Sequence, residues 1–518
     1  MRTVERFCTL VAFTWLACGL FSIAQGQTTE NAVKFDISPP LRGIHPPPKA
    51  RGAFLREHIV KKIPLPPQNR SLFPDITLQR KATTTLPIGP LKSFPGIGVG
   101  GVQFPISSDP PDTNGSAGKS HYVQWVNTGF AVFDKKTGKP VLGPLDGNLI
   151  WSGFGGNCEH FNDGDPIVLY DKIADRWLLT QFAVSGTPFS QCIAVSTSPD
   201  PTGTYARYEY QFQDFNDYPK FGVWPDAYYG TFNMFRDNSF LGAKACAFDR
   251  GKMLSAQQAR MVCFDVNGQG GLLPADQDGA TLPPAGAPNY LLNIGNNELN
   301  LWKFHVDWAH TANSRLTGPT PVATAPFEVA CRNAPISGQC VAQPGTSEML
   351  DTLSDRLMFR LAYRKFANHE SLVVNHAVVV GSSSGIRWYE LRDPGGNPKI
   401  FQQGTYAPDN AFRWMASIAM DKAGDMLMGY SESSSSVFPG IVFTGRSAND
   451  PLNQMAIEQR AEKGSGVQQN PDRWGDYASM SVDPNDDCTF WFSTQYVSAT
   501  GQFNWSTKVE PVRFASCH

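Results

Sequence analysis

The stretch RWGDYASMSVDP, from Arg473 to Pro484, decides the fold because it can be laid over RWMASIAMD, from Arg413 to Asp421. ASIAMD matches ASMSVD at a constant offset of about 62 residues, and the same offset brings MLMGYS onto CTFWFS. Both segments alternate small or apolar residues with polar ones, which is the pattern of a half-buried strand. The stretch is therefore one copy of a strand-rich repeat.

Strand clusters of this kind recur along most of the chain. Beyond Val102 the apolar stretches are short and alternating, and Gly, Pro, Asn or Asp bounds them. They recur at roughly 45 to 60 residues, the period of propeller blades. The clusters begin at His121, Asp165, Asp226, Asn289, Arg356, Arg413 and Asp476. The sequence predicts an all-β protein with a single β-propeller of seven blades, or of six, because the first and fourth clusters match the repeat poorly.

The N-terminal segments differ from the repeats. Residues 1–26 combine Arg2 and Arg6 with an apolar run and a small-residue site, which predicts a secretory signal peptide. Residues 27–104 are rich in proline and read as an extended arm or linker, so residues 105–518 are assigned to the propeller. The last cluster lacks a fourth strand, and we expect the N-terminal part of the domain to supply it and close the ring.

Eight cysteines follow the predicted signal peptide, and an even count in an exported chain favours disulfides. Sequence alone leaves the connectivity open, but pairing of near neighbours would link adjacent strands or close local loops. The expected pairs are Cys158 with Cys192, Cys246 with Cys263, Cys331 with Cys340, and Cys488 with Cys517. The chain has no Cys-x-x-Cys spacing that would indicate a metal site.

Composition limits the class of partner. The formal net charge is -2 and aromatic residues make up 12% of the chain, so nothing indicates nucleic acid or an anionic membrane surface. After the signal peptide no apolar run is long enough to span a bilayer. We expect a secreted or periplasmic monomer whose partner is an extracellular glycan or a cell-surface ligand.

The segment SPDPTGTY, Ser198 to Tyr205, resembles the Asp-box turn of sialidase-like propellers, with one inserted residue and Tyr in place of Trp. Asp-led turns at Asp421 and Asp483 occupy a similar hairpin position. The resemblance implies a secreted bacterial propeller built of hairpin repeats, in which the box ties a hairpin together without doing chemistry. The chain lacks the Arg-Ile-Pro segment of catalytic sialidases, so no catalytic signature is carried over.

If the repeats are blades, the residues just before each innermost strand lie at one mouth of the central channel. Carboxylates and guanidinium groups bind hydroxyls and acidic groups there, and indole faces stack on sugar rings. The candidate catalytic residues are Asp165, Asp476 and, third, Asp226. The candidate substrate-binding residues are Asp163, Trp224, Arg356, Arg413, Trp414, Arg473, Trp474 and Tyr477.

This ring of polar residues supports two functions. Two carboxylates at a glycosidic bond serve as acid and as base or nucleophile, so the protein is predicted to bind extracellular carbohydrate as a glycoside hydrolase or polysaccharide lyase. The alternative is a non-catalytic adhesion or protein-interaction module, because an Asp before an inner strand often accepts backbone N–H bonds or pairs with a neighbouring Arg.

No cofactor is predicted. The oxygen-rich segments NDGDP (162–166) and DPNDD (483–487) leave a structural calcium ion open.

Overall fold

The computed structural model describes residues 26–44, 56–57, 61, 63–64, 75–89, 91–103, 108–332, 334, 338–470 and 472–518. The predicted signal peptide, apart from its last residue, lies outside these residues. Strands dominate the described chain, and its α-helices, α1 (Asn157–His160) and α2 (Arg250–Leu254), are single turns.

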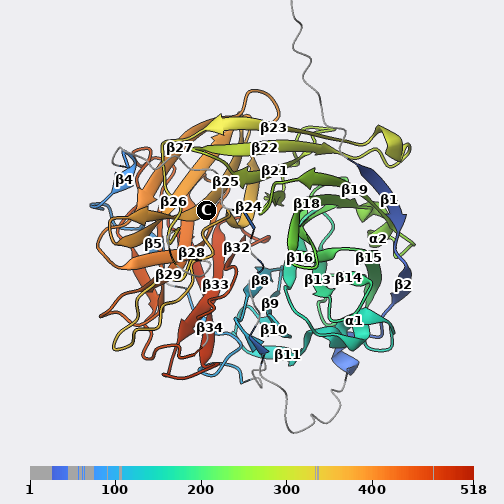
Figure 1. Cartoon of the computed structure of the whole chain (residues 1–518), viewed down its shortest axis with the longest axis horizontal. Coiled ribbons are helices and arrows are strands. Elements are labelled where there is room, and N and C mark those ends of the chain that lie inside the picture. The colour runs from blue at the N-terminus through green and yellow to red at the C-terminus, as the bar shows by residue number, and fades with distance from the viewer. Residues whose placement is uncertain are drawn as a thin grey trace, which may run out of the picture.

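A closed ring of inner strands organises the molecule. These strands are β8 (Thr113–Ala117), β12 (Ile167–Asp171), β16 (Phe215–Val223), β20 (Leu273–Asp278), β24 (Met358–Lys365), β28 (Phe412–Met420) and β32 (Ser479–Val482). Each contacts the next in this order, and β32 contacts β8. The chain therefore runs once round a centre, as the colours of Figure 1 show, from cyan through green, yellow and orange to red.

From each inner strand an antiparallel sheet extends outward. In the first half of the chain the further strands are β9 (His121–Val126), β10 (Gly129–Asp134), β11 (Pro140–Asp146), β13 (Arg176–Ala183), β14 (Phe189–Ser196), β15 (Tyr205–Phe212), β17 (Tyr228–Arg236), β18 (Ser239–Phe248) and β19 (Arg260–Asn267). In the second half they are β21 (Asn289–Ile294), β22 (Glu298–His305), β23 (Arg315–Ala323), β25 (Glu370–Val380), β26 (Ser383–Arg392), β27 (Lys399–Tyr406), β29 (Met426–Ser433), β30 (Gly440–Arg446), β31 (Gln459–Glu462), β33 (Thr489–Val497) and β34 (Trp505–Phe514).

This radial arrangement confirms the predicted all-β propeller. One irregularity bears on the number of blades: β20 pairs in parallel with β24 over Ala275–Asp278, which joins two strand groups into one nine-stranded sheet. The choice between seven and six blades depends on how that sheet is divided, and it stays a prediction.

Three inner strands were absent from the predicted clusters. The sequence placed Asp226–Phe235 first in the third cluster, but β16 precedes it and is the true inner strand. A bulge between Asp217 and Lys220 breaks the alternation of β16. Strands β8 and β20 read TNGSA and LPADQD, which are short and polar, so neither carries a clear alternating signal.

The proline-rich segment packs along the sheets as extra outer strands. Strands β1 (Gln27–Asn31) and β2 (Lys34–Ile37) pair with β19 and β15, and β4 (Leu78–Gln79) pairs with β27. The short β3 (Arg56–Glu57) pairs with β7 (Ser108–Asp109). Both β5 (Ile88–Gly89) and β6 (Phe94–Pro95) pair with β34. The last sheet thus receives its outer strand from the arm, upstream of residue 105; the domain boundaries themselves stay a prediction.

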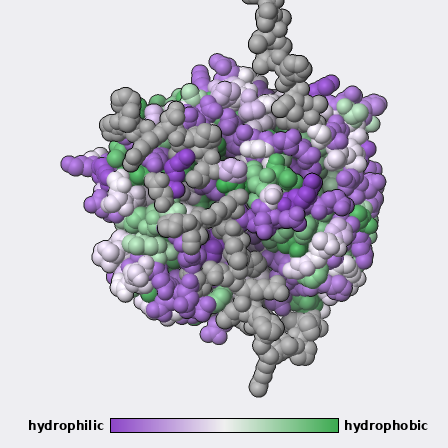
Figure 2. Space-filling model, in the orientation of Figure 1, coloured by the Kyte–Doolittle hydropathy of each residue, from purple (hydrophilic) through white to green (hydrophobic). Residues whose placement is uncertain are grey.

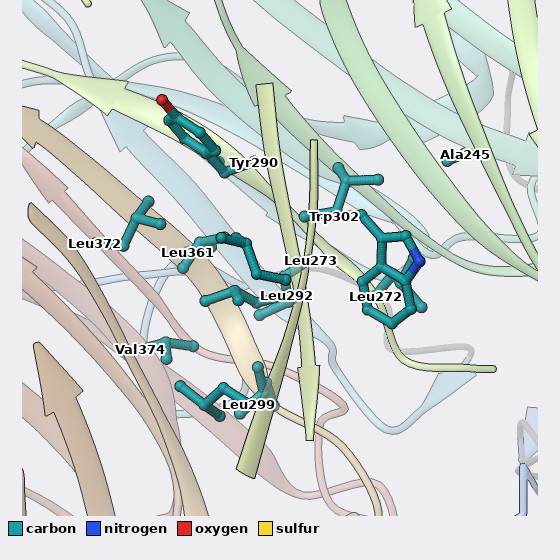
Figure 3. Packing of buried hydrophobic residues seen from close by; sticks show 14 of the residues in the cluster. Ala245, Leu272, Leu273, Tyr290, Leu292, Leu299, Trp302, Leu361, Leu372 and Val374 are labelled. Atoms are coloured by element: carbon teal, nitrogen blue, oxygen red, sulfur yellow. The ribbon is translucent and has the colours of Figure 1, made fainter. Parts of the chain in front are cut away.

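Apolar side chains fill the space between neighbouring sheets. In the cluster of Figure 3, Leu361 of β24 and Leu372 of β25 lie near Leu292 of β21, and all three are fully buried. Burial of such side chains contributes about 1.5–3 kcal/mol each. The surface seen in Figure 2 is mainly hydrophilic, with small separate apolar areas. Packing between sheets therefore holds the ring together.

All four expected disulfides are present: Cys158–Cys192, Cys246–Cys263, Cys331–Cys340 and Cys488–Cys517. The second joins the adjacent strands β18 and β19. Disulfides of this number are typical of oxidising compartments, although secretion itself stays a prediction. No helix within the described ranges has the length and apolar character needed to cross a membrane.

The segment that resembles an Asp-box forms the hairpin between β14 and β15. The Asp200 carboxylate accepts hydrogen bonds from the backbone N–H and hydroxyl of Thr202, at 2.9 and 2.7 Å. The turns at Asp421 and Asp483 lie elsewhere, between the first and second strands of their sheets. The expectation that all three turns share one hairpin position was therefore wrong.

Candidate functional site

Polar side chains from the beginnings of several inner strands meet at one mouth of the ring. Asp112 precedes β8, Asp165 precedes β12, and Tyr218 lies within β16. Their φ angles are 41°, 46° and 53°, in the left-handed region that is unfavourable for residues other than glycine. Strain of this kind, of order 1–3 kcal/mol per residue, persists only where surrounding contacts impose it and is common at functional sites.

We call this group the mouth cluster. Its members are Asp112, Asp165, Asp217, Tyr218, Lys220, Asp351, Arg356, Arg473, Asp476 and Tyr477.

Lys220 occupies the middle of the mouth cluster. Its side chain is fully buried, and its Nζ lies 3.4 Å from the ring centroid of Tyr218 and 4.0 Å from that of Tyr477. The ammonium group donates a hydrogen bond to the carbonyl of Pro219 at 3.0 Å. Two aromatic faces thus stabilise a buried cation through cation–π contacts.

The arginines of the cluster are bound by carboxylates. Arg473 donates to Asp351 at 2.7 Å and to Asp476 at 2.5 Å. The backbone N–H of Asp476 in turn donates to the Asp112 carboxylate at 2.7 Å. Arg356 forms a two-pronged contact with Asp355, at 2.6 and 3.0 Å. These contacts tie the start of β32 to the segments before β8 and β24.

Several carboxyl groups of the cluster have pKa values raised toward neutral pH. Burial, with repulsion from Asp217 and Asp476, raises the pKa of Asp165 to about 7 against the attraction of Lys220. Burial likewise raises the pKa of Asp217 to about 6 and that of Asp351 to about 7.

The same causes act on two further members of the cluster. Burial, followed by the charges of Asp476 and Asp165, raises the pKa of Asp112 well above its usual range. Burial lowers the pKa of Lys220 to about 8. Perturbation of several neighbouring groups is typical of acid–base sites.

Two hydroxyl groups of the cluster lack hydrogen-bond partners. The hydroxyls of Tyr218 and Tyr477 are buried, and no described residue donates to or accepts from either of them. Leaving a buried hydroxyl without a partner costs about 1–3 kcal/mol. Both tyrosines interact electrostatically with Asp165 and Asp476, so the two rings lie near these carboxylates.

The structure brings five of the residues predicted from sequence into this cluster: Asp165, Arg356, Arg473, Asp476 and Tyr477. Their side chains come from widely separated repeats. These five residues therefore lie together, while their catalytic and binding roles stay predictions.

Arg413, Trp414 and Trp474 are placed differently from the expectation. Arg413 is fully buried and binds Glu458 at 2.6 Å and Asp409 at 2.8 Å. The two indole rings pack on each other at 5.2 Å between centroids, and both are fully buried. Arg413 is therefore held by carboxylates outside the mouth cluster, and the indole faces pack on protein.

Trp224 and Asp226 lie after an inner strand, because the preceding strand is β16. Trp224 packs edge-on against Tyr363 at 4.7 Å between centroids, and Asp226 accepts from the hydroxyl of Tyr229 at 3.2 Å. Their predicted place in front of an inner strand was wrong, since the sequence took β17 for the first strand of its sheet.

Asp163 has a structural role. Its carboxylate accepts hydrogen bonds from the backbone N–H groups of Val184 and Ser185, at 2.6 and 2.8 Å. It thereby fixes the connection that follows β13.

Sequence reasoning missed Asp112, Asp217, Tyr218, Lys220 and Asp351. A usable signal was present for Asp112, Asp217 and Tyr218. DPPD (109–112) places Asp beside Pro directly in front of β8, as NDGDP (162–166) does in front of β12, and NDYP (216–219) combines Asp and Pro at the bulge of β16. No such pattern marks Asp351, which becomes part of the cluster only through Arg473.

The segments considered for calcium form hydrogen-bonded turns. In DPNDD, Asp483 binds Lys135 at 2.6 Å and Asp487 binds Arg364 at 2.7 Å. Among the described residues, Asp409, Glu432 and Glu458 lie close enough together to hold a cation. Arg413 binds these carboxylates, at 2.8, 3.5 and 2.6 Å, so the group forms an ion-pair network.

No family model matches the chain, and no curated protein matches it. The sialidase-like resemblance therefore stays a prediction.

Several solved structures share a loose similarity. A polysaccharide lyase, PL25 ulvan lyase, is 10% identical, with a TM-score of 0.36, and the match covers 78% of this chain and 92% of that one. The endo-arabinase of Bacteroides thetaiotaomicron is 10% identical, with a TM-score of 0.27 and coverage of 68% and 94%. The N-terminal domain of Nup159 is 8% identical, with a TM-score of 0.30 and coverage of 89% and 100%.

Proposed function

We propose that the protein is an exported β-propeller that binds extracellular carbohydrate at the mouth cluster and cleaves it. The observation that carries the proposal is the meeting of Asp112, Asp165 and Asp476 with Lys220 and two partnerless tyrosine hydroxyls at one mouth of the ring. Carboxyl and hydroxyl groups in such a setting bind sugar hydroxyls and transfer protons to and from them.

Asp165 and Asp476 take different roles in this proposal. With a pKa of about 7, the Asp165 carboxyl is protonated in about half of the molecules at neutral pH and is suited to protonate a leaving-group oxygen. Asp476, bound to Arg473, is the partner carboxylate that acts as base or nucleophile. Two unlike carboxyl groups beside one another are the requirement of glycoside hydrolysis. In polysaccharide elimination, by contrast, a base removes a proton next to a uronate group.

One observation favours the non-catalytic alternative, an adhesion or protein-interaction module. Asp165 and Asp476 are only 7% and 9% exposed, and Arg473 is bound by carboxylates on two sides. A cluster that is satisfied internally stabilises the ring whether or not a ligand binds.

The test is turnover of a panel of neutral and acidic polysaccharides by the native protein. Release of reducing ends indicates cleavage, and an unsaturated, ultraviolet-absorbing product identifies elimination. The variants Asp165→Asn and Asp476→Asn are each expected to lower turnover by about a hundredfold or more. The control Asp214→Asn changes a surface residue that pairs with Arg236 and is expected to keep native turnover. Binding of a glycan without turnover by the native protein would establish the alternative.

A further inference from the structure

A cavity lies at the outer edge of the ring, where the arm meets the sheet that ends in β27. Its volume is about 610 Å³, within the range of small-ligand sites. It is lined by residues of three segments: 76–81 with Thr83 from the arm, Ala325 with Gln403 from the sheet region, and 452–454 from the connection before β31. None of these belongs to the mouth cluster.

We call this cavity the rim cavity. Hydrogen bonds between the three segments hold its walls in place. The side-chain amide of Gln79 both donates to and accepts from the backbone of Met455, each at 2.8 Å. Asn453 accepts from the backbone N–H of Gln403 at 3.0 Å, and Gln403 accepts from that of Ala325 at 3.0 Å. The cavity is therefore preformed, which lowers the entropic cost of binding.

The charge of the lining is entirely positive. Arg80 and Lys81 are both exposed, and the remaining lining residues are uncharged. Arg80 is oriented by its Nη1, which donates to the carbonyl of Asp409 at 2.8 Å. The carboxylate of Asp409 is itself bound by Arg413 at 2.8 Å. Arg80 and Lys81 are thus the charged residues of the lining, and no acidic residue is among its walls.

The uncharged lining combines hydroxyl-binding groups with small apolar surfaces. Gln454 and Thr83 are exposed, and their side chains make no hydrogen bond with the described part of the chain. Ile76 and Leu452 are 80% and 45% exposed. Amide and hydroxyl groups both donate and accept, which suits a ligand bearing many hydroxyls.

From these features we infer that the rim cavity is a second carbohydrate site, which binds an anionic saccharide such as a uronate-bearing chain. Arg80 and Lys81 bind its acidic groups, Gln454 and Thr83 bind its hydroxyls, and Leu452 contacts the apolar face of a sugar ring. An acidic peptide fits less well, because peptide sites rely on deep apolar pockets for anchoring side chains. This site does not depend on the function proposed for the mouth cluster.

The test is calorimetric titration of the full chain with tetragalacturonic acid, maltotetraose and tetraglutamate at low and moderate salt. Saturable binding of tetragalacturonic acid is expected, weakened by added salt. Lys81→Gln combined with Arg80→Gln is expected to weaken it about three- to tenfold. Leu452→Trp, at a position that is 45% exposed, is expected to fill the cavity and weaken binding without loss of folding.

One control variant and one mouth variant separate this site from others. Lys136→Gln changes an exposed lysine in the turn between β10 and β11 and should keep native affinity. Asp165→Asn tests whether the ligand binds at the mouth cluster instead. Loss of binding in Asp165→Asn but not in the rim variants would place the ligand at the mouth and overturn the inference. Absence of saturable binding would also overturn it, and equal binding of tetraglutamate would replace the saccharide with an acidic peptide.

Discussion

Asp165 sits where burial and neighbouring carboxylates oppose its ionisation. Its pKa of about 7 in the folded protein exceeds the ordinary value of 3.8. The folded state therefore binds this proton more tightly than the unfolded chain does. The associated stability is fully present below about pH 4 and is lost as the pH rises toward 7.

Asp165→Asn removes this pH dependence, because the amide is neutral at every pH. The native protein should lose stability between pH 5 and pH 8, while the variant should not. The free energy of unfolding of the variant relative to that of the native protein should therefore be about 2 kcal/mol higher at pH 8 than at pH 5. Urea denaturation at the two pH values measures the difference.

Asp278 provides the matched control, since its pKa is shifted in the opposite direction. Although burial raises it, the charges of Arg360 and Lys172 lower the pKa of Asp278 to about 2. Its stability contribution is present above about pH 4, so Asp278→Asn should be destabilised equally at pH 5 and pH 8. A constant difference for Asp165→Asn as well would mean that Asp165 does not retain its proton.

The partnerless hydroxyl of Tyr477 leads to a second expectation at the residue scale. Tyr477→Phe removes a buried hydroxyl that no described residue binds and should raise the free energy of unfolding by about 1 kcal/mol. Tyr228→Phe is the control, because its hydroxyl donates to Asp171 at 2.8 Å, and it should lose about 1 kcal/mol. Thermal unfolding without added glycan measures both; a destabilised Tyr477→Phe would show that the hydroxyl is bonded in the free protein.

At the scale of single elements, β6 joins the last sheet to the first. Phe94 of β6 is 5% exposed and packs against Phe133 of β10 and Trp491 of β33, at 5.3 and 6.3 Å between ring centroids. Phe94→Ala should lower the free energy of unfolding by about 3–5 kcal/mol, because it opens a cavity between the two sheets. Leu91→Ala, in the same segment but 44% exposed, should change it by less than about 1 kcal/mol. Equal losses in chemical denaturation would contradict a closing role for β6.

Elements differ in how far the sequence predicts them. Strands β12–β15 and β28–β31 follow the predicted repeats, because their apolar residues alternate and turn residues separate them. Strands β8, β16 and β20 were missed, since inner strands are short, polar or bulged where they approach the channel. The misassignment of Trp224 and Asp226 followed directly from the missed β16.

The candidate site was partly predictable for the same reason. Asp165, Arg473 and Asp476 stand before strands whose repeats are clear in the sequence, so their common location could be inferred. Lys220 could not, because its contact with Tyr477 depends on packing between distant strands. The orientation of Arg413 also escaped prediction, since its carboxylate partners lie on the connection before β28 and near β31.

For the whole molecule, closure of the ring depends on residues that precede the predicted propeller. A chain comprising residues 105–518 lacks β5 and β6 and leaves β34 as an exposed edge strand. A chain comprising residues 82–518 keeps both strands, while β1, β2 and β4 are absent from each. Exposed edge strands pair with other chains, so the shorter chain should unfold at a lower temperature and associate in solution. The longer chain should remain monomeric. Calorimetry and size-exclusion chromatography of the two chains test this, and equal stability would show that the ring closes without the arm.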